Sequence, residues 1–346
     1  MKFLTVIITL FIATSCVRHG ITDQPVPQPP ASGPAASPSP SPSPTPVPEK
    51  LDTELETELA KIAEAAKGRV GVGAVLIETG ETAYLDRTGR YPMQSVYKVP
   101  IAMSVLKMVD EGRIRIDQEV SITPDDFVRQ GFHSPIRNKN PQGTVMPLAD
   151  VLRASVSESD GTATDVLLDL AGGPQAVMTY LNGIGVSDLI VADSVKSISK
   201  DWETQYRNWS TPEGSIKLLR ALHERRSGLS EQITTLLLQL MTETETGDRR
   251  IKHGIPEDAT VAHKTGTGGT QKGITGATND IGIITLADGR HILLAIYVSD
   301  SPGSTAVREK VIADLAQAVV QKWSPESNPE KESVSGVDFG TRHTLQ

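Results

Sequence analysis

Ser95 and Lys98 are the residues whose types and spacing most directly suggest chemistry in this chain. Two side chains three positions apart on a helix lie on the same face, next to each other. Residues 95–110 are mostly apolar and predict a helix that opens at Ser95, where free backbone N–H groups can hold an oxyanion. A buried lysine with a lowered pKa can take the proton of a neighbouring serine. The pair therefore predicts a nucleophilic serine.

The same Ser-x-x-Lys spacing recurs at Ser197 and Lys200, so the spacing alone is not specific. Ser95 follows a polar lead and opens an apolar helix, whereas Ser197 lies within residues 188–210, which have no strong periodicity. Aperiodic connections of this length are usually functional or disordered. The context favours Ser95, and an ordinary surface lysine is the alternative for Lys98.

A second motif, Ser159-Asp160-Gly161, stands immediately before a predicted helix at residues 162–170. Serine and aspartate are common at this place simply as helix caps, because their side chains accept hydrogen bonds from the first N–H groups. By itself this motif does not separate a catalytic role from capping.

A third motif, Lys264-Thr265-Gly266, follows Val261 and Ala262 at the end of a predicted strand. A glycine there lets a ligand approach the backbone closely. The alternative is an edge strand with a solvated lysine. We interpret His263 as structural, because no neighbour in the sequence makes it a base.

In this order the three motifs resemble those of the penicillin-recognising serine hydrolases, and residues 69–323 look like a class A β-lactamase. Residues 91–98 and 205–209 are most similar to the PER-type branch of that family. The resemblance implies an α/β domain built from both chain ends, an inserted all-α domain and an active site in the cleft between them. It also implies a β-lactam as small-molecule substrate, a monomer, and neither metal nor organic cofactor.

The resemblance assigns a role to each matching residue. Ser95 would be the acylated nucleophile, Lys98 its base or proton relay, and Ser159 the group that passes a proton to the lactam nitrogen. The backbone N–H groups of Ser95 and Thr267 would form the oxyanion hole. Binding of the substrate and its carboxylate would fall to Lys264, Thr265, Gly266 and Thr267.

Two positions depart from the family pattern. Gly161 replaces the asparagine that ends the second motif, a loss comparable to removing one oxyanion donor, roughly 2.7 to 4 kcal/mol. The glutamate that activates the hydrolytic water aligns with Val195, or with Ser194 if one residue is inserted. The nearest carboxylates, Asp193 and Glu203, are out of register unless the loop is rebuilt. Since general-base assistance supplies roughly 10² to 10⁴ in rate, we expect an acyl-enzyme at Ser95 that is released slowly.

Two other functions remain open from the sequence alone. A peptidoglycan D-alanyl-D-alanine peptidase or penicillin-binding protein shares the serine and both lysines and needs no such glutamate. A β-lactam-binding module that has lost catalysis would also keep the motifs. The similarity along the whole chain favours a serine β-lactamase, a hydrolase of cyclic amides that confers antibiotic resistance.

Hydrophobic periodicity predicts the fold class as α/β (α+β). We expect a five-stranded antiparallel sheet flanked by terminal helices, with an all-α part at residues 93–241 and an α/β part at 51–92 and 242–323. The strands are expected at residues 69–77, 82–86, 259–267, 280–286 and 292–299, and the terminal helices at 51–67 and 305–323.

The two chain ends predict export and tethering. Residues 1–16 have the layout of a secretory signal that ends at Cys16, the single cysteine and a candidate lipidation site. A plain cleaved signal is the alternative. Residues 17–50 are a Pro- and Ser-rich linker, and residues 324–346 are a polar tail without core residues. The prediction is a periplasmic enzyme, either free or tethered to the membrane as a lipoprotein.

Composition argues against other classes of protein. The net charge is −8 and no basic cluster interleaves with aromatic residues, which argues against nucleic acid as a partner. The seven histidines show no metal-ligand spacing, which disfavours a metalloenzyme. Residues 266–269 are rich in glycine but lack the spacing of a phosphate-binding loop.

Overall fold

The computed structural model describes residues 48–324, which lie in one compact unit. The predicted signal at residues 1–16, with the candidate lipidation site Cys16, lies outside the described residues. So do the predicted linker up to residue 47 and the predicted tail beyond Ser324. No helix within residues 48–324 is long and apolar enough to cross a membrane.

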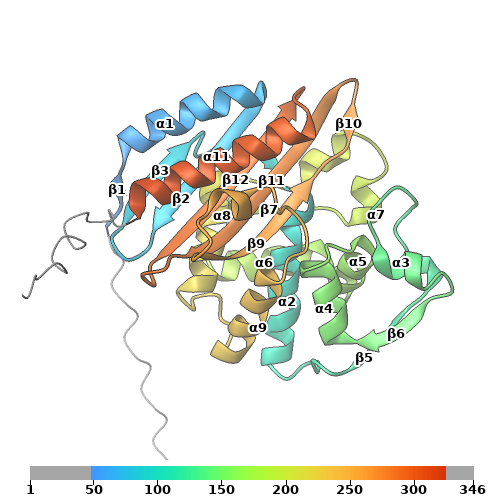
Figure 1. The fold of residues 1–346 in the computed structure, drawn as a ribbon. Helices are drawn as coiled ribbons and strands as arrows, with labels where there is room; N and C mark the ends of the chain where they lie inside the picture. Colours follow the sequence, from blue (N-terminus) through green and yellow to red (C-terminus); the bar gives the residue numbers. More distant parts are fainter. Residues whose placement is uncertain (1–47, 325–346) are drawn as a thin grey trace, which may run out of the picture. The chain divides into compact units, whose positions relative to one another are not determined.

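A five-stranded antiparallel sheet forms the centre of the α/β part, as predicted (Figure 1). Its order is β3-β2-β12-β11-β9, where the strands are β2 (Arg69–Leu76), β3 (Glu81–Leu85), β9 (Thr260–Thr267), β11 (Ile274–Thr285) and β12 (His291–Ser301). Two strands of two residues extend it: β1 (Lys50–Leu51), parallel to β3, and β10 (Thr270–Gln271), antiparallel to β11.

Two terminal helices, α1 (Thr53–Ala63) and α11 (Thr305–Trp323), pack side by side over one face of this sheet (Figure 1). Asp52 caps α1 by accepting a hydrogen bond from the N–H of Leu55, and it also accepts one from the indole of Trp323. The predicted helix at 51–67 begins two residues late because Leu51 pairs with β3. It ends in the 3₁₀ turn η1 (Glu64–Ala66).

The opposite face of the sheet is covered by the helical part (Figure 1). Its central helix is α2 (Lys98–Asp110), in which every residue from Lys98 to Leu106 is buried. The other helices of this part are α3 (Pro135–Lys139), α4 (Leu148–Val156), α5 (Gly161–Leu170), α6 (Pro174–Gly183), α7 (Val195–Ile198), α8 (Pro212–His223) and α9 (Glu231–Thr242). The four-residue helix α10 (Ile251–Gly254) lies beside α11.

The prediction that residues 93–241 are entirely helical is wrong in detail. The strands β5 (Glu119–Ile122) and β6 (Thr144–Pro147) pair as an antiparallel ribbon. The stretch at 188–210 contributes β7 (Leu189–Ile190) and β8 (Trp209–Ser210), and β8 also pairs with β4 (Tyr91–Pro92). These strands are too short to show a two-residue alternation in the sequence, and pairing of distant segments stabilises them.

Packing between the two parts positions the segment that leads to Ser95. Tyr91 stacks on Tyr297 with ring centroids 5.5 Å apart, and the hydroxyl of Tyr297 lies 2.6 Å from that of Ser215 on α8. A Cβ at Gly71 would lie only 2.5 Å from the Tyr91 ring, so glycine is required for this close approach. The strand β4 is therefore fixed against the sheet just before the predicted nucleophile.

Candidate active site

Ser95 lies in the 3₁₀ turn η2 (Gln94–Tyr97), directly before α2, and not in the first α-helical turn as predicted. The turn is entered through Gln94, whose φ of 49° is in the left-handed region that non-glycine residues rarely adopt. Asn279 on β11 donates hydrogen bonds from Nδ2 to the carbonyl oxygens of Pro92 at 2.8 Å and Met93 at 3.1 Å. The sheet thus holds the backbone on the N-terminal side of Ser95.

Gly266 supports the same turn through a close approach of two backbone segments. A Cβ at this position would lie 2.3 Å from the carbonyl oxygen of Met93, closer than any side chain tolerates. Glycine here lets β9 approach the chain's own backbone beside Ser95. The third motif and the turn of the first motif are therefore in direct contact.

Lys98 is buried at the start of α2, one helical turn after Ser95. Its Nζ donates to the carbonyl oxygen of Ser159 at 2.6 Å and to the hydroxyl of Ser159 at 3.2 Å. Burial lowers the pKa of Lys98 to about 8, against the opposing effect of the nearby carboxylates of Asp160 and Asp165. The surface-lysine alternative is therefore wrong.

Ser159 stands between α4 and α5 with a left-handed φ of 60°. The following carboxylate, Asp160, accepts hydrogen bonds from the N–H groups of Ala163 at 2.9 Å and Ile136 at 2.7 Å, and from the hydroxyl of Ser134. The capping interpretation is therefore right for Asp160. This network orients Ser159, whose hydroxyl lies within hydrogen-bonding distance of Lys98 and Lys264.

Lys264 approaches the same hydroxyl from β9. Its Nζ lies 3.0 Å from Ser159 Oγ and 3.2 Å from the carbonyl oxygen of Thr265. Burial and the neighbouring positive charge of Lys98 lower the pKa of Lys264 well below its ordinary value. Although β9 is an edge strand, Lys264 is fully buried, so the alternative of a solvated lysine is wrong.

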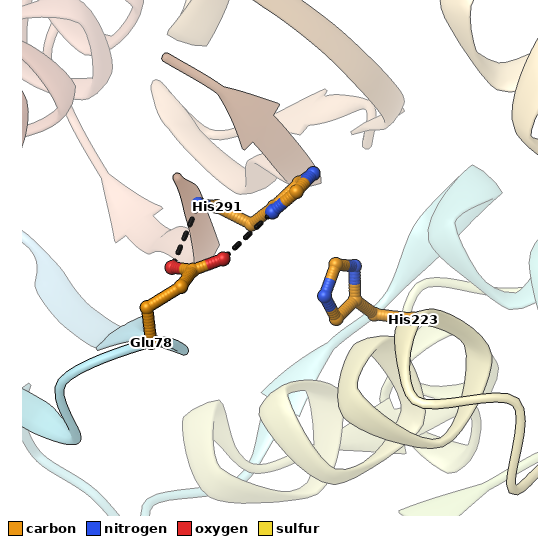
Figure 2. Close-up of side chains that lie close together, drawn as sticks. All are labelled: Glu78, His223 and His291. Carbon is orange, nitrogen blue, oxygen red and sulfur yellow. Dashed lines mark hydrogen bonds and ion pairs between the residues drawn. The ribbon is translucent and has the colours of Figure 1, made fainter. Parts of the chain in front are cut away.

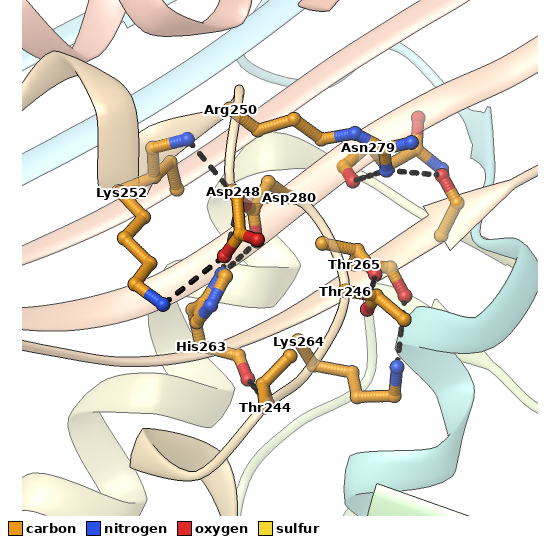
Figure 3. Close-up of polar contacts among 12 residues, drawn as sticks. Thr244, Thr246, Asp248, Arg250, Lys252, His263, Lys264, Thr265, Asn279 and Asp280 are labelled. Atoms are coloured by element: carbon orange, nitrogen blue, oxygen red, sulfur yellow. Dashed lines mark hydrogen bonds and ion pairs between the residues drawn. The ribbon is translucent and has the colours of Figure 1, made fainter. Parts of the chain in front are cut away.

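Arg250 is a candidate site residue that the sequence did not reveal (Figure 3). Its guanidinium donates to the hydroxyl of Thr267 at 2.8 Å and to the carbonyl oxygens of Gly266 at 3.2 Å and Asn279 at 2.9 Å. It also lies 3.3 Å from the carboxylate of Glu309. The arginine stands before α10 and no local pattern links it to the third motif, which it meets only in the folded chain.

Two further contacts hold the third motif on its strand (Figure 3). The hydroxyl of Thr265 is hydrogen-bonded to that of Thr246. His263, on the other side of Lys264, is buried and places Nδ1 3.0 Å from the carboxylate of Asp280. This arrangement agrees with the structural interpretation of His263.

The two positions at which we expect a departure from the family pattern, Gly161 and Val195, lie close together. Val195 is the first residue of α7 and is only 5 % exposed. A Cβ built on Gly161 would lie 3.2 Å from Cγ1 of Val195. The carboxylate of Asp165 accepts hydrogen bonds from the N–H groups of Val195 at 2.6 Å and Lys196 at 2.9 Å, which fixes the start of α7. The isopropyl group of Val195 thus lies next to the place that a side chain at position 161 would occupy.

The carboxylates considered as substitutes for the missing glutamate are engaged or exposed. Asp193 pairs with Arg207, whose Nε lies 3.0 Å from Asp193 Oδ2. The side-chain amide of Asn208 accepts from the N–H of Asp193 at 2.9 Å and donates to its carbonyl oxygen at 2.8 Å, so the backbone there is held in place. Glu203, in η4 (Glu203–Arg207), is exposed. Neither carboxylate is hydrogen-bonded or ion-paired to Lys98 or Lys264.

Comparison with known proteins gives a consistent result. Residues 54–323 match the model of the beta-lactamase enzyme family. Over 260 residues the chain is 36 % identical to beta-lactamase VEB-1 of Pseudomonas aeruginosa, covering 75 % of this chain and 87 % of that protein. It is 38 % identical over 263 residues to the extended-spectrum beta-lactamase PER-1 of the same organism, covering 76 % and 85 %. A solved beta-lactamase from Chitinophaga pinensis superposes with a TM-score of 0.75 at 39 % identity, covering 78 % of this chain and 99 % of that one.

The chain therefore belongs to the beta-lactamase enzyme family, in its class A, which confirms the family, the fold class and the kind of enzyme predicted from the motifs. It is a serine hydrolase of β-lactams. The predicted likeness to the PER type is matched by the identity to PER-1, with VEB-1 similar to nearly the same degree.

Proposed function

We propose that this enzyme forms an acyl-enzyme with β-lactams at Ser95 and releases the product slowly. The observation that supports acylation is the hydroxyl of Ser159, which lies within 3.2 Å of Lys98 Nζ and within 3.0 Å of Lys264 Nζ. The observation that supports slow release is Val195, a buried aliphatic side chain whose Cγ1 would lie 3.2 Å from a Cβ built on Gly161. Machinery for the first step is assembled, and a general base for the second is absent at the aligned position.

Acylation begins with attack of Ser95 Oγ on the lactam carbonyl carbon. The hydroxyl proton passes to neutral Lys98, and the carbonyl C–N bond then breaks as Ser159 gives its proton to the lactam nitrogen. Lys98 returns a proton to Ser159 through their hydrogen bond, so no net proton is taken up. The product is an ester on Ser95. The backbone N–H groups of Ser95 and Thr267 stabilise the oxyanion of the intermediate.

Cationic and hydroxyl groups on one side of the site suit a substrate carboxylate. Lys264 and Thr265 are the residues that we assign to this contact, together with Gly266 and Thr267. Arg250 adds a second cation, since its guanidinium donates to the Thr267 hydroxyl at 2.8 Å. An arginine that presents a planar set of donors binds a carboxylate with defined geometry. We therefore include Arg250 in the carboxylate-binding group.

Release of the product requires water to attack the Ser95 ester. A water molecule is a poor nucleophile unless a base takes its proton, and valine at position 195 offers no such base. Because Asp193 is paired with Arg207, we do not assign it this role. The ester is expected to hydrolyse roughly 10² to 10⁴ times more slowly than with general-base assistance.

Intact-protein mass spectrometry after mixing with a penicillin tests this proposal. We expect an adduct of one penicillin per chain that accumulates within seconds and decays slowly, and a burst of chromogenic cephalosporin hydrolysis equal to the enzyme concentration. Fast steady turnover without adduct would overturn slow release. Absence of both adduct and turnover would overturn acylation. Cleavage of a D-alanyl-D-alanine peptide would instead favour the peptidase alternative.

The rate of acylation is expected to rise with pH, with a midpoint near 8. Lys98 must be neutral to accept the serine proton, and its pKa is lowered to about 8, so the active fraction falls about tenfold for each pH unit below that value. The measurement is the burst rate at saturating cephalosporin between pH 5.5 and 9.5. Deprotonation of Lys264, which we assign to the substrate carboxylate, would change mainly the cephalosporin concentration that gives half of the maximal burst rate. A flat burst rate across this range would contradict the assignment of Lys98.

We further propose that the enzyme is exported and that Cys16 is lipidated, which would tether the catalytic domain through the linker at residues 17–50. The support is the sequence alone: an apolar run after Lys2, small residues before Cys16, and no other cysteine. Metabolic labelling with a fatty-acid analogue, compared between the natural chain and C16A, tests the anchor. Equal labelling of both chains would contradict it.

A further inference from the structure

A histidine and carboxylate cluster at the far end of the sheet is not used by the chemistry above. His223 ends α8, His291 begins β12, and Glu78 lies in the turn between β2 and β3, so three distant segments converge (Figure 2). One potential ligand atom from each residue lies within 4.8 Å of those from the other two. All three side chains are partly or fully accessible to solvent.

We propose that Glu78, His223 and His291 bind one divalent transition-metal ion, with Zn²⁺ as the best match. Imidazole nitrogen and carboxylate oxygen are ordinary zinc ligands at about 2.0 to 2.2 Å, and two histidines with one carboxylate leave a fourth position for water. Hard cations such as Mg²⁺ prefer oxygen ligands only, so the two imidazoles select against them.

The side chains of Glu78 and His291 already lie close enough together to bind one metal ion. Glu78 Oε1 lies 2.8 Å from His291 Nδ1, and Glu78 Oε2 accepts the backbone N–H of His291 at 3.0 Å. The carboxylate is therefore fixed beside an imidazole nitrogen with which it shares a proton. A metal ion would take the place of that proton, which would move to Nε2 or leave to solvent.

His223 completes the cluster from the helical part. Its ring centroid lies 4.5 Å from that of His291, with the ring planes tilted by 51°. Ligand atoms around a tetrahedral zinc ion are roughly 3.3 Å apart, so a side-chain movement of about 1.5 Å closes the site. Two arginines close to these histidines in the sequence, Arg220 and Arg290, are already ion-paired with Glu224 and Asp288. Their electrostatic repulsion of a bound metal ion is therefore reduced.

The site is separate from the active site. In the register of the sheet, Thr285 on β11 pairs with His291, while Thr278 pairs with Thr267 of the third motif. The intervening stretch of β11 is roughly 23 Å long at about 3.3 Å per residue. A bound ion would therefore connect α8 to the sheet, and would stabilise the fold without taking part in lactam hydrolysis.

The test is a titration of the EDTA-treated full chain with ZnCl₂ by isothermal titration calorimetry. We expect one ion per chain, a Tm raised by about 5 °C at saturation, and reversal by EDTA. H223A and H291A should each weaken binding at least tenfold, and the conservative E78Q about tenfold. H253A is the matched control, because His253 is an exposed histidine on α10, and it should bind like the natural chain.

Two further measurements keep this test decisive. Equal Tm values of all variants in EDTA show that a loss of binding is not a loss of folding. A Co²⁺-substituted sample should show the visible absorption of a tetrahedral site in the natural chain and not in the double variant H223A/H291A. Unchanged zinc affinity in that double variant would overturn the proposal, as would absence of saturable binding up to 1 mM Zn²⁺.

Discussion

Replacing Ser95 with alanine is expected to abolish the covalent adduct and to lower the rate of lactam ring opening in the first turnover by a factor on the order of 10⁶. Removal of the nucleophile leaves only binding and oxyanion stabilisation, which accelerate hydrolysis far less. The change removes one hydroxyl from a partly exposed position in η2, so the fold should be preserved. Intact mass after exposure to penicillin, together with cephalosporin hydrolysis, measures both effects.

The chain contains its own matched control for this experiment. Ser197 and Lys200 repeat the Ser-x-x-Lys spacing, but Ser197 lies within the short helix α7, whose cap Ser194 accepts a hydrogen bond from its N–H. S197A should therefore retain the adduct, the burst and the Tm of the natural chain. An adduct that persists in S95A, or that disappears in S197A, would show that the wrong serine was assigned.

The fold could be predicted where local pattern and tertiary structure agree. The predicted helix at 305–323 matches α11 at both ends, because its apolar residues face the sheet and Ser304 caps it. The predicted strand at 280–286 was too short, since β11 begins at Ile274. Its first half is rich in threonine, glycine and asparagine, and it is buried because β9 and β12 pair with it on both sides. Pairing of this kind leaves no hydrophobic alternation to read.

The candidate site could be predicted where its residues form ordered motifs. Lys98, Ser159 and Lys264 were each ambiguous in the sequence, and the structure places both lysines within hydrogen-bonding distance of the Ser159 hydroxyl. Arg250 could not be predicted, because its link to the third motif exists only through the packing of β9 and β11. The proximity of Glu78, His223 and His291 could not be predicted from spacing along the chain, because three distant segments bring them together.

The contact between Gly161 and Val195 shows the same limit most clearly. The resemblance predicts two separate departures from the family pattern, at Gly161 and Val195. The structure shows that they occupy one place, with Val195 Cγ1 at 3.2 Å from a Cβ built on Gly161. A side chain at position 161 and a longer side chain at position 195 therefore share limited space. A substitution at either position therefore changes the surroundings of the side chain at the other.

Replacing Val195 with glutamate is expected to shorten the lifetime of the acyl-enzyme by roughly 10² to 10⁴, the usual contribution of a general base. The position is suitable because α7 is anchored by the carboxylate of Asp165, which holds the N–H groups of Val195 and Lys196. The change in lifetime is measured by following the penicillin adduct by mass spectrometry after excess penicillin is removed. Acylation, which does not depend on this position, should change little.

Four further variants distinguish a general base at position 195 from a loop that has merely become more mobile. V195Q has nearly the same shape as V195E but cannot take a proton, so it should leave the adduct long-lived. D193N should also have no effect on release, because Asp193 is paired with Arg207. G161N places a side chain next to Val195, so the effects of G161N and V195E on deacylation are expected to be non-additive in the double variant G161N/V195E. Equal acceleration by V195Q and V195E would mean that loop mobility limits release, and a slower release in D193N would make Asp193 the base.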